Sequence, residues 1–325
     1  MPIIARMFQM RYFFWAIFIA LLALLPEMGL PRSWLLYIFL FFIYLAMASM
    51  WNLLCGYCGL ISLCQPAFIG LAGYALVVTT WNSFSIFWGI LLGCIVSALF
   101  AGLISIPTFR LRGIYFAIGT LVVPEAMRVI FFLWRPVGGT IHGKGAGYMI
   151  KGLSDFPMAG IYWLALSIGV ISVIIKRFIL TSKMGLGLSA IRDNEDTASS
   201  SGVNVYMLKL ITFVISAVVT AVAGAIFFMY QGYIEPTGAF SMNWTMILML
   251  ATVIGGIGIE KGPIIGTAII VFLHFELARY GGVSLLIQGI LLIIIMLLMP
   301  GGIMGYVQET KMYAYISGLV RSEKS

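Results

Sequence analysis

Charged side chains are scarce in this chain. Asp, Glu, Lys and Arg make up 9% of its 325 residues, whereas 62% of the residues are hydrophobic. From Ser33 to Phe109 the sequence contains no charged residue at all, a run of 77 residues. A helix that crosses the hydrocarbon core needs about 20 apolar residues, so this run has room for about three membrane spans. The composition therefore indicates an integral membrane protein and excludes a soluble domain.

Residues that serve as catalysts or metal ligands are also few. The chain has two histidines and four cysteines. Cys55 and Cys58 have the C-x-x-C spacing of half a zinc site, but no second such pair exists and neither histidine is close in sequence. We expect the cysteines to be small packing residues. No cluster of His, Asp and Glu is present in the sequence, so we expect no metal, no cofactor and no enzymatic activity.

A nucleotide-binding site is not expected either. The segment 138–145 reads GGTIHGKG, which has the G-x-x-x-x-G-K spacing of a phosphate-binding loop. Gly145 replaces the Ser or Thr that would bind magnesium in such a loop, and no buried strand is predicted before it. We interpret this segment as a glycine-rich external loop.

The long apolar stretches predict an all-α fold. Backbone groups in lipid must be paired internally, which leaves helices or closed barrels, and these stretches are far longer than barrel strands. Turn and charge signals divide the chain into ten segments, at 12–30, 34–53, 59–80, 86–106, 114–134, 159–179, 207–229, 243–257, 263–280 and 284–300. We therefore predict a single polytopic transmembrane domain over residues 1–325.

Two of these segments are interrupted by glycine and proline. The third segment, 59–80, contains Pro66 and several glycines, and the eighth, 243–257, ends near Gly255 and Gly256. If the ten segments form two halves of five, the two interrupted segments occupy matching positions. In a transporter built from inverted repeats, such positions point to the transport site. Alternatively, the glycines only permit close helix packing, and both interpretations stay open.

The distribution of basic residues predicts the orientation in the membrane. With a cytoplasmic N-terminus, 13 of the 19 Lys and Arg residues fall on the cytoplasmic side, as the positive-inside rule expects. The other six are Arg32, Arg128, Arg135, Lys144, Lys151 and Arg279. Both termini are therefore predicted to be cytoplasmic. The net charge of +8 reflects this topology rather than nucleic-acid binding.

A polar segment, Thr181 to Asn204, lies between two long apolar stretches. Residues 188–199 are predicted to form one short helix with Ile191 and Ala198 on a common face. The charged residues of this segment, Arg192, Asp193, Glu195 and Asp196, are expected to remain solvated. Because two spans can be connected by fewer and less structured residues, we interpret this cytoplasmic segment as a docking surface for a soluble partner.

Few polar groups lie inside the predicted spans. Glu125 and Arg128 are three residues apart, on one face of a helix, near the middle of the fifth segment and directly after Pro124. Ionisable groups in a membrane usually face a bundle interior or an aqueous pathway, although this pair alternatively only orients its helix. Gln65 and Asn52 are uncharged candidates, and either alternatively only bonds a neighbouring helix. We expect Gln65, Glu125 and Arg128 to line or gate a solute path.

Several motifs, in order along the chain, are similar to those of one family. These are 52–63 (NLLCGYCGLISL), 67–74 (AFIGLAGY), 110–121 (RLRGIYFAIGTL), 138–140 (GGT), 185–205, 209–217 (KLITFVISA), 255–258 (GGIG), 262–266 (GPIIG) and 300–305 (PGGIMG). Together they resemble the permeases of branched-chain amino acid ABC importers, and specifically the M-type subunit. The resemblance covers residues 40–306 approximately.

The resemblance implies a set of partners. Such permeases pair with a second related permease, two ATP-binding subunits and a periplasmic or extracellular substrate-binding protein, in the inner membrane of a prokaryote. It also implies that residues 181–206 form a loop that couples to the ATPase. The residues implied to make this contact are Ser189, Ala190, Ile191, Arg192, Asp193, Glu195, Ala198 and Gly202. Leu186, Ser189, Ser199 and Ser200 depart from the arginine- and alanine-richer pattern of the family, and Cys64-Gln65 replaces a frequent Gly-His or Gly-Gln.

The leading hypothesis is a permease subunit of an ATP-binding cassette importer for branched-chain amino acids or similar small polar solutes. Because no phosphate-binding loop is expected in this chain, a partner must hydrolyse ATP. The alternatives are a permease for urea or short amides, and a self-sufficient secondary transporter driven by ions through Glu125.

Overall fold

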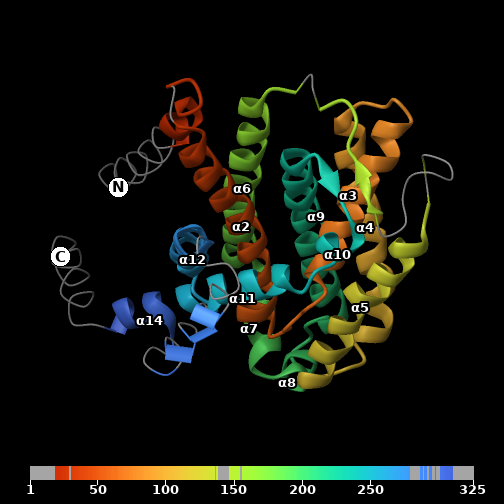
Figure 1. Cartoon of the computed structure of the whole chain (residues 1–325). Helices are drawn as coiled ribbons and strands as arrows, with labels where there is room; N and C mark the ends of the chain where they lie inside the picture. The colour runs from red at the N-terminus through yellow and green to blue at the C-terminus, as the bar shows by residue number, and fades with distance from the viewer. Residues whose placement is uncertain are drawn as a thin grey trace, which may run out of the picture.

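The computed structural model describes residues 19–28, 31–135, 137, 146–153, 156–278 and 301–309, together with scattered positions between 286 and 297. Helices dominate these residues (Figure 1). The strands β1 (Tyr148–Met149) and β2 (Tyr233–Ile234) pair antiparallel, with Tyr148 opposite Ile234. The predicted helical fold is confirmed for these residues, whereas the inverted repeat stays a prediction. The external loop expected at 138–145 lies outside the described residues.

Within the described residues, six helices are long and apolar enough to cross a membrane. They are α2 (Arg32–Asn52) with the π-helix η1 (Leu53–Tyr57), α4 (Ile86–Thr108), α5 (Ile114–Leu133), α6 (Met158–Thr181), α9 (Val205–Gln231), and α10 (Pro236–Ala239) with α11 (Asn243–Gly255). Three further helices are α3 (Gln65–Trp81), α12 (Gly262–Ala278) and α14 (Gly302–Glu309). The structure describes only parts of the predicted segments 12–30 and 284–300, so a count of ten spans stays a prediction.

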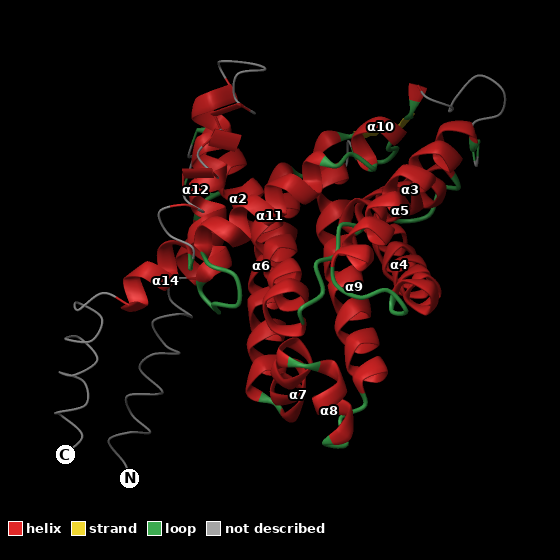
Figure 2. Cartoon of the chain, turned by 90° about the horizontal axis from the view of Figure 1, so that it is seen from below, coloured by secondary structure: helices red, strands yellow, loops and turns green. Residues whose placement is uncertain are grey.

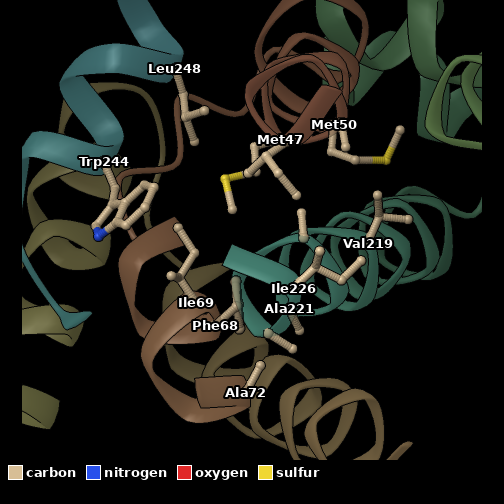
Figure 3. Close-up of a cluster of buried hydrophobic side chains, with 14 of the residues drawn as sticks. Met47, Met50, Phe68, Ile69, Ala72, Val219, Ala221, Ile226, Trp244 and Leu248 are labelled. Atoms are coloured by element: carbon tan, nitrogen blue, oxygen red, sulfur yellow. The ribbon is translucent and has the colours of Figure 1, made fainter. Parts of the chain in front are cut away.

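Helix α2 is the centre of the bundle. It packs against α6, α9, α11 and α12, and nearly every residue from Phe39 to Asn52 is buried. A helix that is hydrophobic on all sides is expected in such a position. In Figure 3, Met47 of α2 lies among side chains from α3, α9 and α11, including Ile69, Ile226 and Leu248. In two views related by a quarter turn, α12 and α14 lie on one side of the bundle and α4 and α5 on the other (Figure 1, Figure 2).

Small residues set the distances between the central helices. A Cβ added to Gly224 of α9 would lie 2.8 Å from the Ile69 Cα of α3, and one added to Gly70 would lie 2.2 Å from the Phe240 ring. The Phe240 ring in turn stacks on Tyr74, with centroids 6.0 Å apart. Small side chains allow close approach of helices where lipid supplies no hydrophobic driving force between them. These glycines therefore have a packing role.

The helix predicted over 59–80 is wrong at its beginning. After η1 the chain is not helical from residue 59 to residue 64, and α3 begins only at Gln65. Gly59 has a φ of 74°, which glycine adopts without steric cost, and Pro66 lies in the first turn of α3, where proline is tolerated. The chain thus leaves the helix at a glycine and resumes it at a proline.

The single helix predicted over 188–199 is also wrong. The segment forms two helices, α7 (Lys183–Asp193) and α8 (Glu195–Ser200), separated by Asn194. Asn194 has an extended backbone, and its side chain accepts a hydrogen bond from Thr197 N at 2.9 Å. Asn is a favoured N-cap residue because its side-chain oxygen satisfies an unpaired amide of the first turn. The break therefore follows from the sequence at Asn194.

Candidate functional site

The non-helical segment 59–64, in which Leu60, Ser62 and Cys64 are buried, is hydrogen-bonded to side chains of three helices. Leu63 N donates to Thr120 Oγ1 of α5 at 3.1 Å, and Thr245 Oγ1 of α11 donates to Leu63 O at 3.4 Å. Trp51 Nε1 of α2 donates to Ser62 O at 2.8 Å. Irregular backbone at membrane depth is tolerated only where it is buried in protein or lines a cavity. Discontinuous helices of this kind mark solute sites in many transporters.

Gln65 lies where this segment enters α3, and its side chain is fully buried. Its Nε2 donates to Ser216 Oγ of α9 at 3.5 Å. Among the described residues, its Oε1 has no hydrogen-bond partner, and neither has Thr220 Oγ1, one turn further along α9. A buried unpaired acceptor destabilises a protein by about 1–3 kcal/mol. The bundle interior therefore holds unused hydrogen-bonding capacity beside the break in α3.

Glu125 and Arg128 form an ion pair on α5, with Arg128 Nε 2.8 Å from Glu125 Oε2. The buried face of α5 carries Phe116, Thr120, Pro124, Met127 and Phe131. The side chains of the ion pair are instead partly exposed, Glu125 by 47% and Arg128 by 41%. Within the described residues no hydrogen bond joins this pair to Gln65, so the three predicted path residues do not form one cluster in this structure.

At the α7–α8 end of the bundle, apolar side chains anchor the polar segment. Leu188, Ile191 and Ala198 are buried, and Leu188 belongs to the hydrophobic core of the bundle. Ser189 and Ala190 are half-buried, whereas Arg192, Asp193 and Gly202 are exposed. The Ile191 and Ala198 side chains are therefore covered by the chain itself in this structure.

Contrary to the prediction, the Glu195 carboxylate is not free in solvent. It forms an ion pair with Lys209 of α9, a residue whose side chain is only 4% exposed. Breaking a buried pair leaves an uncompensated charge, which destabilises a protein by about 3–5 kcal/mol. Glu195 therefore attaches α8 to α9, fourteen residues further along the chain.

The outer surface of α7 and α8 carries one strongly exposed apolar side chain and two exposed acidic ones. Leu186, whose only signal in the sequence is its departure from a family pattern, is 76% exposed, and Asp193 and Asp196 are also exposed. Asp196 pairs with Arg112 of the α4–α5 connection at 3.2 Å, and this hydrogen bond raises the pKa of Arg112. A polar hollow of about 270 Å³ lies beside this pair, lined by Cys58, Gly59, Arg112 and residues 191–196.

A second polar cluster at this end surrounds the glycine-rich turn between α11 and α12. Asn52 accepts from Gly258 N at 2.8 Å and donates to Ile259 O at 3.0 Å. Lys176 of α6, a fully buried residue, donates to Glu260 O at 2.7 Å. The signal for Asn52 is its polar side chain in a long apolar run. For Lys176 the sequence indicates only a position near the predicted cytoplasmic end of the segment 159–179.

Neither the cysteines nor other ligand-type side chains form a metal site in the described part of the chain. All four cysteines are free, and no group of three or more His, Cys, Asp and Glu side chains is found among the described residues. Burial raises the pKa of the Cys58 thiol to about 12, so Cys58 is an uncharged packing residue at neutral pH.

Comparison with known proteins identifies relatives over most of the chain. Residues 33–300 match the family described as branched-chain amino acid transport system / permease component. The permease protein LivM of the high-affinity branched-chain amino acid transport system of Salmonella typhimurium is 25% identical over 288 residues, which cover 81% of this chain and 68% of that protein. No solved structure matches the chain.

Two further relatives match shorter regions. LivH, another permease protein of that transport system, from Escherichia coli, is 31% identical over 150 residues, which cover 46% of this chain and 47% of LivH. The nucleoside ABC transporter permease protein NupC of Lactococcus lactis is 26% identical over 166 residues, which cover 48% of this chain and 50% of NupC. The relatives are thus transport permeases whose names give different solutes.

Proposed function

Because this chain belongs to the family of permease components of branched-chain amino acid transport systems, we propose that it imports branched-chain amino acids or similar small polar solutes. It does so as the membrane subunit of an ATP-binding cassette importer. The observation that carries the proposal is the α7–α8 unit, a folded polar surface anchored at one end of an apolar bundle. Such a surface has the form that a soluble, energy-supplying partner needs.

Leu186 is the proposed centre of the contact with an ATP-binding subunit. An apolar side chain on a short helix outside the apolar spans fits a partner groove in the manner of helix-in-groove recognition. Asp193 and Asp196 lie on the same α7–α8 unit and are paired with Arg192 and Arg112. Ser189, Ala190 and Gly202 complete this surface. Ile191, Glu195 and Ala198 are partly or fully covered by the chain and support the surface, and Arg192 bonds inward to Gly56 O. In this proposal the coupling loop is 181–206 within one permease domain.

The half-exposed pair of Glu125 and Arg128 supports a second permease subunit. Charges facing lipid near the middle of a span are costly, so such groups normally face protein or water. A related permease that covers the exposed face of α5 would remove the pair from lipid, and a solute path would form along the interface between the two permeases. Gln65, which is buried in this conformation, would reach the path when the segment 59–64 moves.

Basic residues support the orientation of the importer. Arg112, Lys176, Arg177 and Lys209 all bond to groups at the α7–α8 end of the bundle or at the turn beside it. The positive-inside rule assigns that end to the cytoplasm. We propose a prokaryotic inner-membrane protein with cytoplasmic termini, and a substrate-binding protein that delivers solute to the opposite side.

The test is reconstitution of the permease with its ATP-binding subunits, second permease and binding protein in liposomes. Uptake of radiolabelled leucine is expected only with ATP inside the liposomes, and an uncoupler should leave it unchanged. Uptake that persists without ATP and collapses with the uncoupler would establish the ion-driven alternative through Glu125. ATP-driven uptake of urea or acetamide in place of leucine would keep the transport class and replace the solute.

A further inference from the structure

Arg192 connects the cytoplasmic helix α7 to the irregular end of α2. Its Nη1 donates to Gly56 O at 3.0 Å, across 136 positions of sequence. Gly56 lies inside the π-helix η1. A single π-helical turn within an α-helix is rare and is frequent at functional sites. A charged side chain from the coupling loop thus holds the backbone at the point where α2 changes its winding.

The contact at Gly56 continues into the glycine-rich turn between α11 and α12. A Cβ added to Gly56 would lie 2.4 Å from Gly258 N and 2.5 Å from Asn52 Oδ1. Asn52 itself holds the turn through Gly258 N and Ile259 O. The backbone of η1 therefore packs directly on this turn, and no side chain fits between them to absorb a displacement.

The same turn is also tied to α6, the helix that leads into α7. Lys176 bonds to Glu260 O at 2.7 Å, and Arg177 pairs with the Glu260 carboxylate at 3.2 Å. Only Ser182 separates α6 from α7. The contacts thus connect α7 to η1, η1 to the turn, and the turn to α6, which continues directly into α7.

We propose that Arg192 is a positioning residue that transmits displacement of α7 to the π-helical end of α2, and from there to the segment 59–65. This inference rests on the proposed function, because the displacement comes from the ATP-binding subunits. In the segment that follows η1, Gln65 carries the unpaired buried oxygen. Arg192 therefore acts through the backbone of η1, and its guanidinium needs no contact with solute.

The experiment compares Arg192→Gln, Arg192→Lys and Lys183→Gln in the complete reconstituted complex. Lys183 is an exposed cation at the start of α7, so its variant removes the same charge from the same helix without touching η1. Arg192→Gln is expected to retain the ATP-binding subunits and ATP hydrolysis while leucine uptake per ATP falls by about tenfold, within the usual range of coupling effects. Arg192→Lys should recover part of this ratio, and Lys183→Gln should match the unmodified chain.

A second measurement follows the backbone of η1 directly. Hydrogen exchange of the amides of residues 53–60 is expected to respond to a non-hydrolysable ATP analogue in the unmodified complex and not in Arg192→Gln. An unchanged ratio of uptake to hydrolysis in Arg192→Gln would overturn the inference while leaving the proposed function intact. Loss of the ATP-binding subunits from Arg192→Gln would overturn it too, by making Arg192 a docking contact. Absence of ATP-dependent uptake by the unmodified complex would reject both proposals.

Discussion

Lys209 of α9 and Glu195 of α8 form an ion pair in which the lysine is almost completely buried, with 4% of its side chain exposed. The pair lies where the polar segment meets the membrane helices, and it attaches α8 to α9. A buried ammonium depends on its partner because transfer of an isolated charge out of water is strongly unfavourable. The attachment of α8 is therefore electrostatic as well as apolar.

Glu195→Ala is expected to destabilise the protein more than any exposed acidic substitution on the same surface. The variant leaves Lys209 buried without a partner, at about 3–5 kcal/mol. Thermal unfolding in detergent measures the effect, with Asp193→Asn as the exposed control. Because an apolar replacement of both partners is often neutral, Glu195→Ala with Lys209→Met should recover most of the loss. Equal melting of Glu195→Ala and the control would contradict the role of the pair.

Leu186→Asp is expected to weaken association with the ATP-binding subunits without affecting folding. The side chain touches solvent over 76% of its surface, so its loss leaves no cavity in the chain. Truncation of an interface anchor weakens binding by about 2 kcal/mol or more, which is roughly 30-fold. Co-purification at increasing dilution measures this, and Leu186→Met serves as the conservative control. Undiminished co-purification of Leu186→Asp would exclude Leu186 from the contact.

Glu125→Ala is expected to lower uptake because it leaves Arg128 unpaired inside a span. Insertion scales assign about 3 kcal/mol to such a charge at the centre of a membrane helix. The exchanged pair Glu125→Arg with Arg128→Glu keeps both charges and should insert normally. Leucine uptake, normalised to the amount of inserted protein, separates a path role from a purely structural one. Full uptake by correctly inserted Glu125→Ala would leave the pair only the role of orienting α5.

Gly70→Ala is expected to destabilise the helix bundle, because the added methyl group would lie 2.2 Å from the Phe240 ring. Overpacking of this kind costs about 1–3 kcal/mol. Gly102→Ala on α4 is the matched control, since a Cβ there meets nothing within 4 Å, and alanine is about 0.5–1 kcal/mol more favourable than glycine within a helix. Opposite shifts of the two melting temperatures are expected. A stable Gly70→Ala would require the ring to move aside.

The sequence is a good guide to the helices and a poor guide to their interruptions. Length and hydrophobicity are local properties, so the apolar segments between 34 and 280 could be located. The break at 59–64 depends on hydroxyl groups of Thr120 and Thr245, which no local pattern relates to Leu63. Asn194 did carry a local signal, because an Asn before two acidic residues is a typical helix start.

The residues of the candidate site are likewise only partly recognisable from the sequence. The polar segment and the intramembrane ion pair stand out by composition, so both are recognisable in the sequence alone. The inward orientation of Glu195 is not, because its partner Lys209 lies in the next span. In the sequence Lys176 resembles an ordinary cation at the end of a span, because its acceptor is the distant backbone of Glu260. The roles of these residues in transport remain predictions.

The hydrogen bonds between the Leu63 backbone and two threonine hydroxyls have a consequence for which positions tolerate substitution. The backbone of residue 63 is held by hydroxyls 57 and 182 positions away, so the chemical requirement lies at those distant positions and not at residue 63 itself. A mutational scan should find position 63 permissive for apolar side chains, and positions 120 and 245 restricted to serine and threonine. Removing a hydroxyl at either position deprives the main chain of a partner that secondary structure elsewhere provides automatically.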